Sequence, residues 1–164
     1  MGGVIVSTVQ RTVLIVDDTP ENLDLLKAIL APHYKVKAAI NGEAALRLAA
    51  AAPPDIVLLD VMMPGLNGYE VCERMMADTA LRHIPVVLVT ALAESMDDGK
   101  GFAAGAVDYI TKPVSAPVVL NRVKSHLDLV DLQCAAKDAL GALRRGDSSA
   151  AEKRLAAILD GEAA

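Results

Sequence analysis

Five short runs of β-forming residues constrain the fold of this chain more than any other feature of its sequence. The third and fourth runs are apolar at every position, so neither of their faces can be left to solvent. Such strands belong to parallel sheets that are covered by helices on both sides, and segments with helical spacing of apolar residues separate the runs. The sequence therefore predicts a doubly wound α/β fold with a five-stranded parallel sheet. The predicted strands cover residues 12–16, 35–39, 56–59, 86–89 and 107–110.

Proline, glycine and capping residues mark where the intervening helices should begin and end. Thr19 offers a hydroxyl cap and Pro20 suits the first helical position, so a helix should run from there to Pro32. Further helices are expected from residue 42 to about 53, over 69–77, over 95–104 and from 116 onward. The helix over 95–104 contains Gly99 and Gly101, each of which costs about 1 kcal/mol of helix propensity, so this helix should be weakly held.

The chain is longer than one such domain needs. We expect a leader over residues 1–11, a domain over 12–130 and a helical tail over 131–164 in which no output domain is recognised. Leu120, Val123, Leu127 and Val130 have an a/d-like spacing, so the last helix of the domain should extend as a short coiled coil. A turn and a small amphipathic helix over 150–159 should follow. Two interpretations of this C-terminal extension remain open: a marginal helix or truncated linker, and an element for dimerisation or partner docking.

Charge and hydropathy exclude two classes of partner. The net charge is −5 and no basic patch is visible, which argues against direct binding of nucleic acid. No apolar run approaches the roughly 18 residues of a membrane span, so no membrane insertion is expected. The apolar stretch near the start of the chain also lacks the basic beginning of a signal peptide. These features predict a cytoplasmic protein.

Polar residues stand where the predicted strands end. Asp17 and Asp18 follow the first strand, Asp60 the third, Thr90 the fourth and Lys112 the fifth. One Asp at a strand end is usually a turn residue, but residues at the carboxyl ends of parallel strands converge on the ligand crevice of a doubly wound sheet. Clustered carboxylates favour Mg²⁺, and a nearby ammonium and hydroxyl suit a phosphoryl group. We therefore predict that Asp60 is a nucleophile that forms an acyl phosphate.

With these residues noted, the sequence resembles the receiver domain of two-component response regulators over about residues 12–130. The resemblance rests on four runs: Val13 to Asp18, Asp55 to Gly65, Val89 to Ala91 and Asp108 to Pro113. It implies a flavodoxin-like sheet in the order 2-1-3-4-5. It also implies phosphotransfer from the phosphohistidine of a sensor histidine kinase or histidine phosphotransfer protein. Such a module catalyses only its own phosphorylation and dephosphorylation.

The resemblance also implies a distribution of roles around a magnesium ion. Asp18 and Asp60 would bind Mg²⁺ directly, and the backbone carbonyl of Met62 would be the third protein ligand. Asp17 would act mainly through a metal-bound water. The run that begins at Asp17 is similar to receivers joined to cyclic-dinucleotide enzymes or hybrid kinases, which would suit a fragment of a larger regulator.

Further roles concern the phosphoryl group and its readout. Thr90 and the backbone N–H of Ala91 would bind phosphoryl oxygens, Lys112 would pair with another, and the bond from Lys112 to Pro113 would be cis. Switching in the family couples Thr90 to the aromatic residue of the fifth strand, here Tyr109. The face formed by the helix over 95–104, the strand over 107–110 and the helix from 116 would then dimerise or bind a downstream protein effector.

Two other functional classes remain as alternatives. The first is a pseudo-receiver that is not phosphorylated and acts as a protein scaffold, although the intact Asp18, Asp60, Thr90 and Lys112 argue against it. The second is an aspartyl-phosphate phosphatase of the haloacid dehalogenase type. Those enzymes typically carry a second Asp two residues after the nucleophile of the first strand, and the residue two past Asp17 is Thr19.

Overall fold

The computed structural model describes residues 9–91 and 99–160 of the chain. The chain divides into two compact units, and the boundary lies between Leu120 and Asn121. The elements are β1 (Thr12–Val16), α1 (Pro20–Leu30), β2 (Lys35–Ala39), α2 (Gly42–Ala51), β3 (Ile56–Asp60), α3 (Gly68–Ala77), β4 (Val86–Thr90), α5 (Lys100–Ala103), β5 (Asp108–Thr111), α6 (Ala116–Arg144) and α7 (Ser148–Leu159). The predicted leader is described only from Val9 onward.

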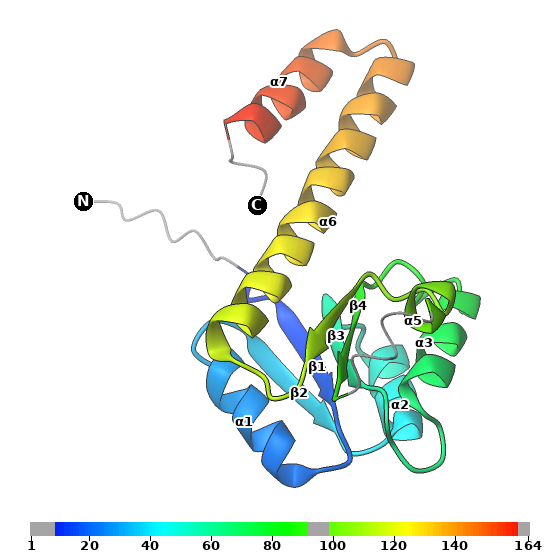
Figure 1. Cartoon of the computed structure of the whole chain (residues 1–164). Helices are drawn as coiled ribbons and strands as arrows, with labels where there is room; N and C mark the ends of the chain where they lie inside the picture. The colour runs from blue at the N-terminus through cyan, green and yellow to red at the C-terminus, as the bar shows by residue number, and fades with distance from the viewer. Residues whose placement is uncertain (1–8, 92–98, 161–164) are drawn as a thin grey trace. The chain divides into compact units, whose positions relative to one another are not determined.

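The first unit is built on a five-stranded sheet in the order β2-β1-β3-β4-β5, in which every neighbouring pair is parallel. This confirms the predicted fold class and strand order. Helix α1 lies on one face of the sheet, while α2 and α3 lie on the other (Figure 1). All residues of β3 and β4 are buried, which explains why these two runs contain no polar residue before their last positions.

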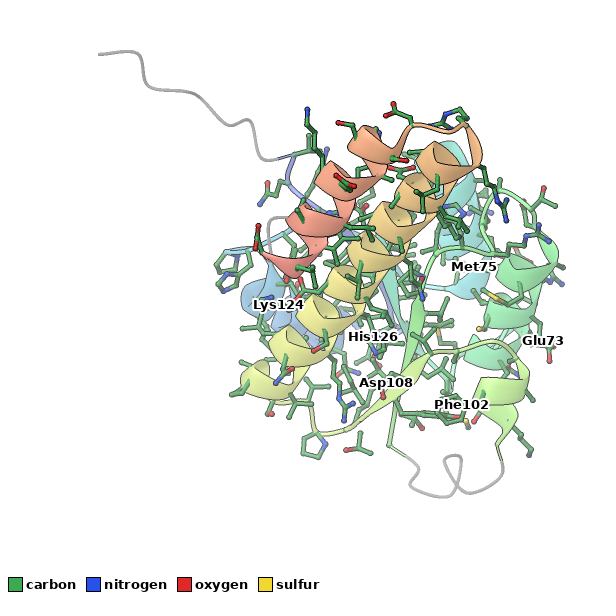
Figure 2. The ribbon with its side chains drawn as sticks, turned by 90° about the horizontal axis from the view of Figure 1, so that it is seen from above. Glu73, Met75, Phe102, Asp108, Lys124 and His126 are labelled. Carbon is green, nitrogen blue, oxygen red and sulfur yellow. The ribbon has the colours of Figure 1, made fainter. Side chains whose placement is uncertain are left out.

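Each covering helix buries one stripe and exposes the other. On α1, the buried residues are Leu23, Leu26 and Leu30. On α3, Met75 is buried against the sheet while Glu73 is exposed at the outer edge of the helix (Figure 2). The helices were predicted from this amphipathic spacing. The buried residues of each helix pack on the sheet and form an apolar layer there.

Helix starts differ from the prediction in one chemical detail. Thr19 is the N-cap of α1, but its hydroxyl makes no capping hydrogen bond. Its backbone N–H instead donates to Asp17 Oδ1 at 2.9 Å, so the expectation of a hydroxyl cap was wrong. By contrast, the Asn41 side chain caps α2, and Asn67 forms a capping box with Glu70 at the start of α3.

The helix predicted over residues 95–104 is corrected by the structure. Residues 95–98 lie outside the described part of the chain, and α5 begins at Lys100. Gly99 precedes the helix with φ of 64°, a left-handed conformation that other residues seldom adopt. Gly99 therefore begins the helix and does not weaken its interior. Gly101 does lie within α5, where it is buried.

The second unit is a helical hairpin. Helix α6 continues without interruption through Gly141 to Arg144, and α7 starts after Gly146 with its N-terminus capped by the Asp147 side chain. Three alanines are buried in it: Ala139, Ala142 and Ala151. An ion pair of 2.7 Å between Arg154 and Asp138 joins the two helices. Leu127 of α6 is buried as well, whereas Leu129, Leu132, Leu140 and Leu143 are about half exposed.

Within the described residues, no helix combines the length and the apolar character that crossing a bilayer requires.

Candidate functional site

Three carboxylates meet at the carboxyl ends of two adjacent strands. Asp17 and Asp18 follow β1, and Asp60 is the last residue of β3, whose Leu59 lies opposite Val16. One carboxylate oxygen from each residue lies within 4.8 Å of the others. Asp17 is 1% exposed and Asp60 is 5% exposed, whereas Asp18 is open to solvent. The parallel sheet therefore places two buried acids and one exposed acid at a single point.

Lys112 brings a positive charge to this cluster from the end of β5. Its Nζ lies 2.8 Å from Asp17 Oδ2 and 3.3 Å from Asp60 Oδ1. Its backbone N–H donates to the carbonyl of Thr90 at 2.8 Å, and the Lys112–Pro113 peptide bond is cis. The chain leaving β5 is thus fixed against the end of β4 while the lysine side chain reaches across to the carboxylates.

The two buried carboxylates are held very differently. Asp17 accepts from the Thr19 backbone N–H, from Lys112 Nζ and from Asn22 Nδ2, which lies 3.2 Å from Oδ1 and 3.0 Å from Oδ2. Asp60 has longer contacts, from Lys112 at 3.3 Å and from the Met62 backbone N–H at 3.4 Å. Among the described residues, both of these contacts to Asp60 are made to its Oδ1 atom.

The remaining predicted site residues occupy the same edge of the sheet. Thr90, at the end of β4, is fully buried and lies between the ends of β3 and β5. Ala91 follows it and is exposed. Met62 follows Asp60 by two residues and exposes 64% of its surface. The structure thus brings together, at one end of the sheet, the residues that the sequence placed after strands β1, β3, β4 and β5.

Charge and burial shift the acid–base properties of this cluster. Burial, and next the charge of Asp17, raise the pKa of Asp60, and Lys112 offsets only part of this effect. Burial alone would lower the pKa of Lys112, but its hydrogen bond to Asp17 and the charges of Asp60 and Asp17 raise it. Three carboxylates therefore face one ammonium, and the excess negative charge suits a small hard cation with oxygen ligands such as Mg²⁺.

Comparison of the chain with known families gives a match to one of them. The family described as response regulator receiver domain matches residues 13–124. The chain belongs to the response regulator receiver domain family. Receiver domains bind Mg²⁺ at an acidic site of this kind, so the donor set of this receiver fits the ion that its family uses.

Several relatives of this receiver domain are known. A probable cyclic di-GMP phosphodiesterase of Vibrio cholerae is 45% identical over 72% of this chain and 27% of that protein. The response regulator PleD of Caulobacter vibrioides is 47% identical over 69% of this chain and 25% of that protein. The chain thus spans about a quarter of these two relatives. Protein PilH of Pseudomonas aeruginosa is 39% identical over 70% of this chain and 96% of that protein.

Solved structures agree with the fold of this receiver domain. A putative response regulator from Chloroflexus aurantiacus gives a TM-score of 0.68 at 34% identity, over 72% of this chain and 98% of that one. The receiver domain of the sensor histidine kinase PA1611 from Pseudomonas aeruginosa gives 0.67 at 28% identity, over 73% and 98% of the two chains. That second structure was solved with a magnesium ion coordinated in its active-site cleft.

The predicted switch residue of this receiver domain is buried beside a glycine. Tyr109 is 4% exposed, and its ring meets the ring of Phe102 edge-on at a centroid distance of 5.1 Å. A Cβ atom on Gly101 would lie 2.0 Å from the Tyr109 hydroxyl oxygen, so the ring occupies the space that the missing side chain leaves. Burial raises the pKa of Tyr109. Whether this ring moves with phosphorylation stays a prediction.

Sequence reasoning missed the roles of three residues that shape this receiver site. Asn22 donates to Asp17, Gly68 lets the first turn of α3 approach the backbone of Asp60, and Gly101 accommodates Tyr109. Asn22 had a usable signal, because it follows Asp17 by five residues in a helix that begins at Pro20. The two glycines had none, since their roles depend on which backbone or ring lies against them in the folded state.

A stability prediction follows from the raised pKa of Asp60. A carboxyl group whose folded pKa is raised above its ordinary value of 3.8 binds protons more readily in the folded state. The wild type should therefore lose stability, relative to Asp60→Asn, as the pH rises above that value. We expect Asp60→Asn to unfold at a higher temperature than the wild type at pH 7 in a chelator. The two melting temperatures should converge as the pH is lowered.

Thermal unfolding across pH checks this expectation. Asp24→Asn is the matched control, because it removes one carboxylate from the exposed side of α1. A melting-temperature difference between Asp60→Asn and the wild type that did not depend on pH would contradict the prediction.

Proposed function

We propose that this chain is a phosphorylation switch in which Asp60 accepts a phosphoryl group from a phosphohistidine. The donor would be a sensor histidine kinase or a histidine phosphotransfer protein. The observation that carries the proposal is the position of Asp60 in a receiver fold, beside two further carboxylates and 3.3 Å from the Lys112 ammonium. Burial and the neighbouring carboxylates oppose further negative charge at Asp60, so a cation and Lys112 would have to compensate the charge that the phosphoryl group brings.

The proposed transfer assigns a task to each group in the site. A carboxylate oxygen of Asp60 attacks phosphorus, the bond from phosphorus to the donor nitrogen breaks, and the donor histidine retains that electron pair. Lys112 neutralises one phosphoryl oxygen. The Thr90 hydroxyl and the Ala91 backbone N–H hydrogen-bond the others. These donors act where negative charge gathers on the transferred group.

The cation site is proposed from the same residues. Asp18, Asp60 and the Met62 carbonyl would hold Mg²⁺, with Asp17 acting through a bound water. The ion would supply positive charge to the phosphoryl oxygens and so lower the repulsion between an anionic donor and an anionic acceptor. The close approach of Asp17, Asp18 and Asp60 supports this assignment.

Phosphorylation by a small donor tests the proposal. Incubation of the full chain with acetyl phosphate and Mg²⁺ is expected to add one phosphoryl group, measured as intact mass. Asp60→Asn should show no gain, and omission of Mg²⁺ with chelator present should remove it. Asp24→Asn should be phosphorylated as the wild type is, because it removes an exposed carboxylate of α1.

Each other outcome has its own meaning. An unmodified wild type would favour a pseudo-receiver scaffold and contradict the switch. Sustained release of phosphate from external phosphate esters would favour a phosphatase. A gain that persists in Asp60→Asn would place the acceptor elsewhere.

The output of the switch is proposed to use the face formed by α5, β5 and the start of α6. Three large apolar residues are exposed there: Phe102 by 55%, Val107 by 43% and Val118 by 45%. Apolar surface of this kind suits a protein partner or a second copy of the chain. The hairpin of α6 and α7 is a second candidate for dimerisation, because Leu129, Leu132, Leu140 and Leu143 are all about half exposed on α6.

A further inference from the structure

We propose that Asn22 is a positioning residue that commits Asp17 to hydrogen bonding and so leaves the cation to Asp18 and Asp60. Asn22 lies in the first turn of α1, and its Nδ2 is 3.2 Å from Asp17 Oδ1 and 3.0 Å from Oδ2. The inference rests on the proposed function, since it concerns the same cation site. It adds a residue whose effect is exerted entirely through Asp17.

Asp17 has a limited number of hydrogen-bond acceptor positions. An ionised carboxylate offers about four lone-pair positions, two on each oxygen. Oδ1 of Asp17 faces the Thr19 backbone N–H and Asn22, while Oδ2 faces Asn22 and Lys112 Nζ. Three donor groups therefore hold Asp17, and Asn22 contacts both of its oxygens. At most one lone-pair position is left, which a metal-bound water can use as a hydrogen-bond donor, whereas a direct bond to a cation would compete with Asn22 or Lys112.

The other two carboxylates have fewer donors than Asp17 has. The described contacts to Asp60, from Lys112 and Met62, both fall on Oδ1. Asp18 is exposed, so its oxygens are open to solvent. The donors are thus concentrated on Asp17, although Asp17 and Asp60 are almost equally buried. This distribution leaves Asp60 and Asp18 with oxygen positions that a cation and a phosphoryl group can use.

The three donors to Asp17 differ in whether they would remain in place when Asp60 is phosphorylated. Lys112 is shared, because its Nζ also lies 3.3 Å from Asp60, and a phosphoryl group on Asp60 would draw it away from Asp17. The Thr19 N–H satisfies only Oδ1. Asn22 is the donor that touches both oxygens, and it is fixed by a helix that begins with Pro20. It is uncharged, so it can hold Asp17 without competing with the cation for negative charge.

The inference predicts opposite effects on cation binding and on phosphoryl transfer. In Asn22→Leu, a side chain of similar size that cannot donate, Asp17 is released and can join the cation directly. We expect the Mg²⁺ dissociation constant to fall by about tenfold, which is the scale of one hydrogen bond to a charged group. We expect the rate of phosphorylation by acetyl phosphate to fall as well, because the cation is then drawn from Asp60 toward Asp17. A purely structural role would weaken both properties together.

Asn22→Asp sharpens the test. It places a fourth carboxylate against Asp17 where a donor stood, so the cation-free protein should melt at a lower temperature than Asn22→Leu. Mg²⁺ should restore most of this loss, because a bound cation relieves the repulsion. The increase in melting temperature produced by Mg²⁺ is therefore expected to rank Asn22→Asp above Asn22→Leu, and Asn22→Leu above the wild type.

The experiment combines calorimetric titration with Mg²⁺, melting temperature with and without Mg²⁺, and phosphorylation rate for the full chain. Asp24→Asn on the same helix is the control and should match the wild type in all three measurements. Asn22→Gln, which retains a donor, should return toward the wild type and keeps the test usable if one variant does not fold. Unchanged or weaker Mg²⁺ binding in Asn22→Leu and Asn22→Asp, with a wild type that binds Mg²⁺ and is phosphorylated, overturns this inference alone. A wild type that does neither overturns the proposed function and this inference with it.

Discussion

Gly101→Ala is expected to expel the Tyr109 ring from its buried position and to destabilise the first unit by about 3 kcal/mol. The added Cβ would lie 2.0 Å from the Tyr109 hydroxyl oxygen, 2.6 Å from its Cζ and 2.6 Å from Leu88 Cδ1. Real carbon atoms do not approach so closely, so either the ring or the short α5 must move. In both cases the phenol loses burial, which is the largest cause of its raised pKa.

Three measurements check this expectation. Denaturant unfolding gives the loss of stability, ultraviolet titration should show the pKa of Tyr109 falling toward its ordinary value, and amide exchange should accelerate in α5 and β5. Gly141→Ala is the matched control, because it is also a helical glycine but its nearest contact is the mobile end of Arg145 at 3.3 Å. That substitution should be neutral or stabilise by up to about 1 kcal/mol.

A double-mutant cycle isolates the cause of the effect. If the ring is what the new methyl group meets, Gly101→Ala combined with Tyr109→Ala should cost clearly less than the sum of the two single changes. Additive costs would show that the clash with Leu88, or strain in α5 itself, dominates.

Gly68→Ala is expected to be the most damaging single change near the proposed acceptor Asp60, at about 3 kcal/mol or more. The new Cβ would lie 2.4 Å from the Asp60 carbonyl oxygen and 2.8 Å from Val61 Cα. These are backbone atoms of a buried strand end, so they cannot swing aside as a side chain can. The first turn of α3 must retreat instead, which breaks the 2.9 Å hydrogen bond from the Gly68 N–H to the Val61 carbonyl.

Gly68→Ala is also expected to slow the proposed phosphorylation. Phosphorylation of Asp60 by acetyl phosphate should slow in Gly68→Ala even at temperatures where circular dichroism shows a folded domain, because the segment after Asp60 is displaced. Gly65→Ala in the same loop is the comparison. Gly65 has φ of 74° with open space around its Cβ position, so its cost should be only about 1–2 kcal/mol of backbone strain. Equal costs at the two positions would show that contact with the Asp60 backbone is not the deciding factor.

The fold could be predicted from this sequence because its strongest signals are local. Runs such as Val57 to Leu59 are apolar on both faces, and this alone favours a parallel sheet between helices. The placement of Asp60 and Lys112 at one edge then follows from parallel strand direction, whatever the loops do. The ends of the strands were less predictable, and two of them differ from the prediction by one residue: β3 includes Asp60, and β5 begins at Asp108.

The missed features share a different physical origin. Gly99 was expected inside a helix, although its left-handed φ places it before the helix, because φ is not visible in composition or periodicity. Thr19 was expected to cap through its hydroxyl, but the N–H of Asn22 donates to the Thr19 backbone carbonyl, and the Thr19 N–H itself donates to the buried Asp17 carboxylate. Asn22 was missed although its contact with Asp17 is local, since the spacing of five residues becomes informative only when it is combined with the helix start at Pro20.

The bridge between Lys112 and Asp17 joins residues that are 95 positions apart. During synthesis the three acids are made well before the lysine that balances them, since β5 is the last strand of the sheet to leave the ribosome. An unfinished chain therefore presents mutually repelling carboxylates without the ammonium that balances them. Under the proposed function, we expect a kinase not to phosphorylate nascent or broken copies that lack β5. Competence to carry the signal would then begin only when the sheet is complete, so defective copies would not dilute the message.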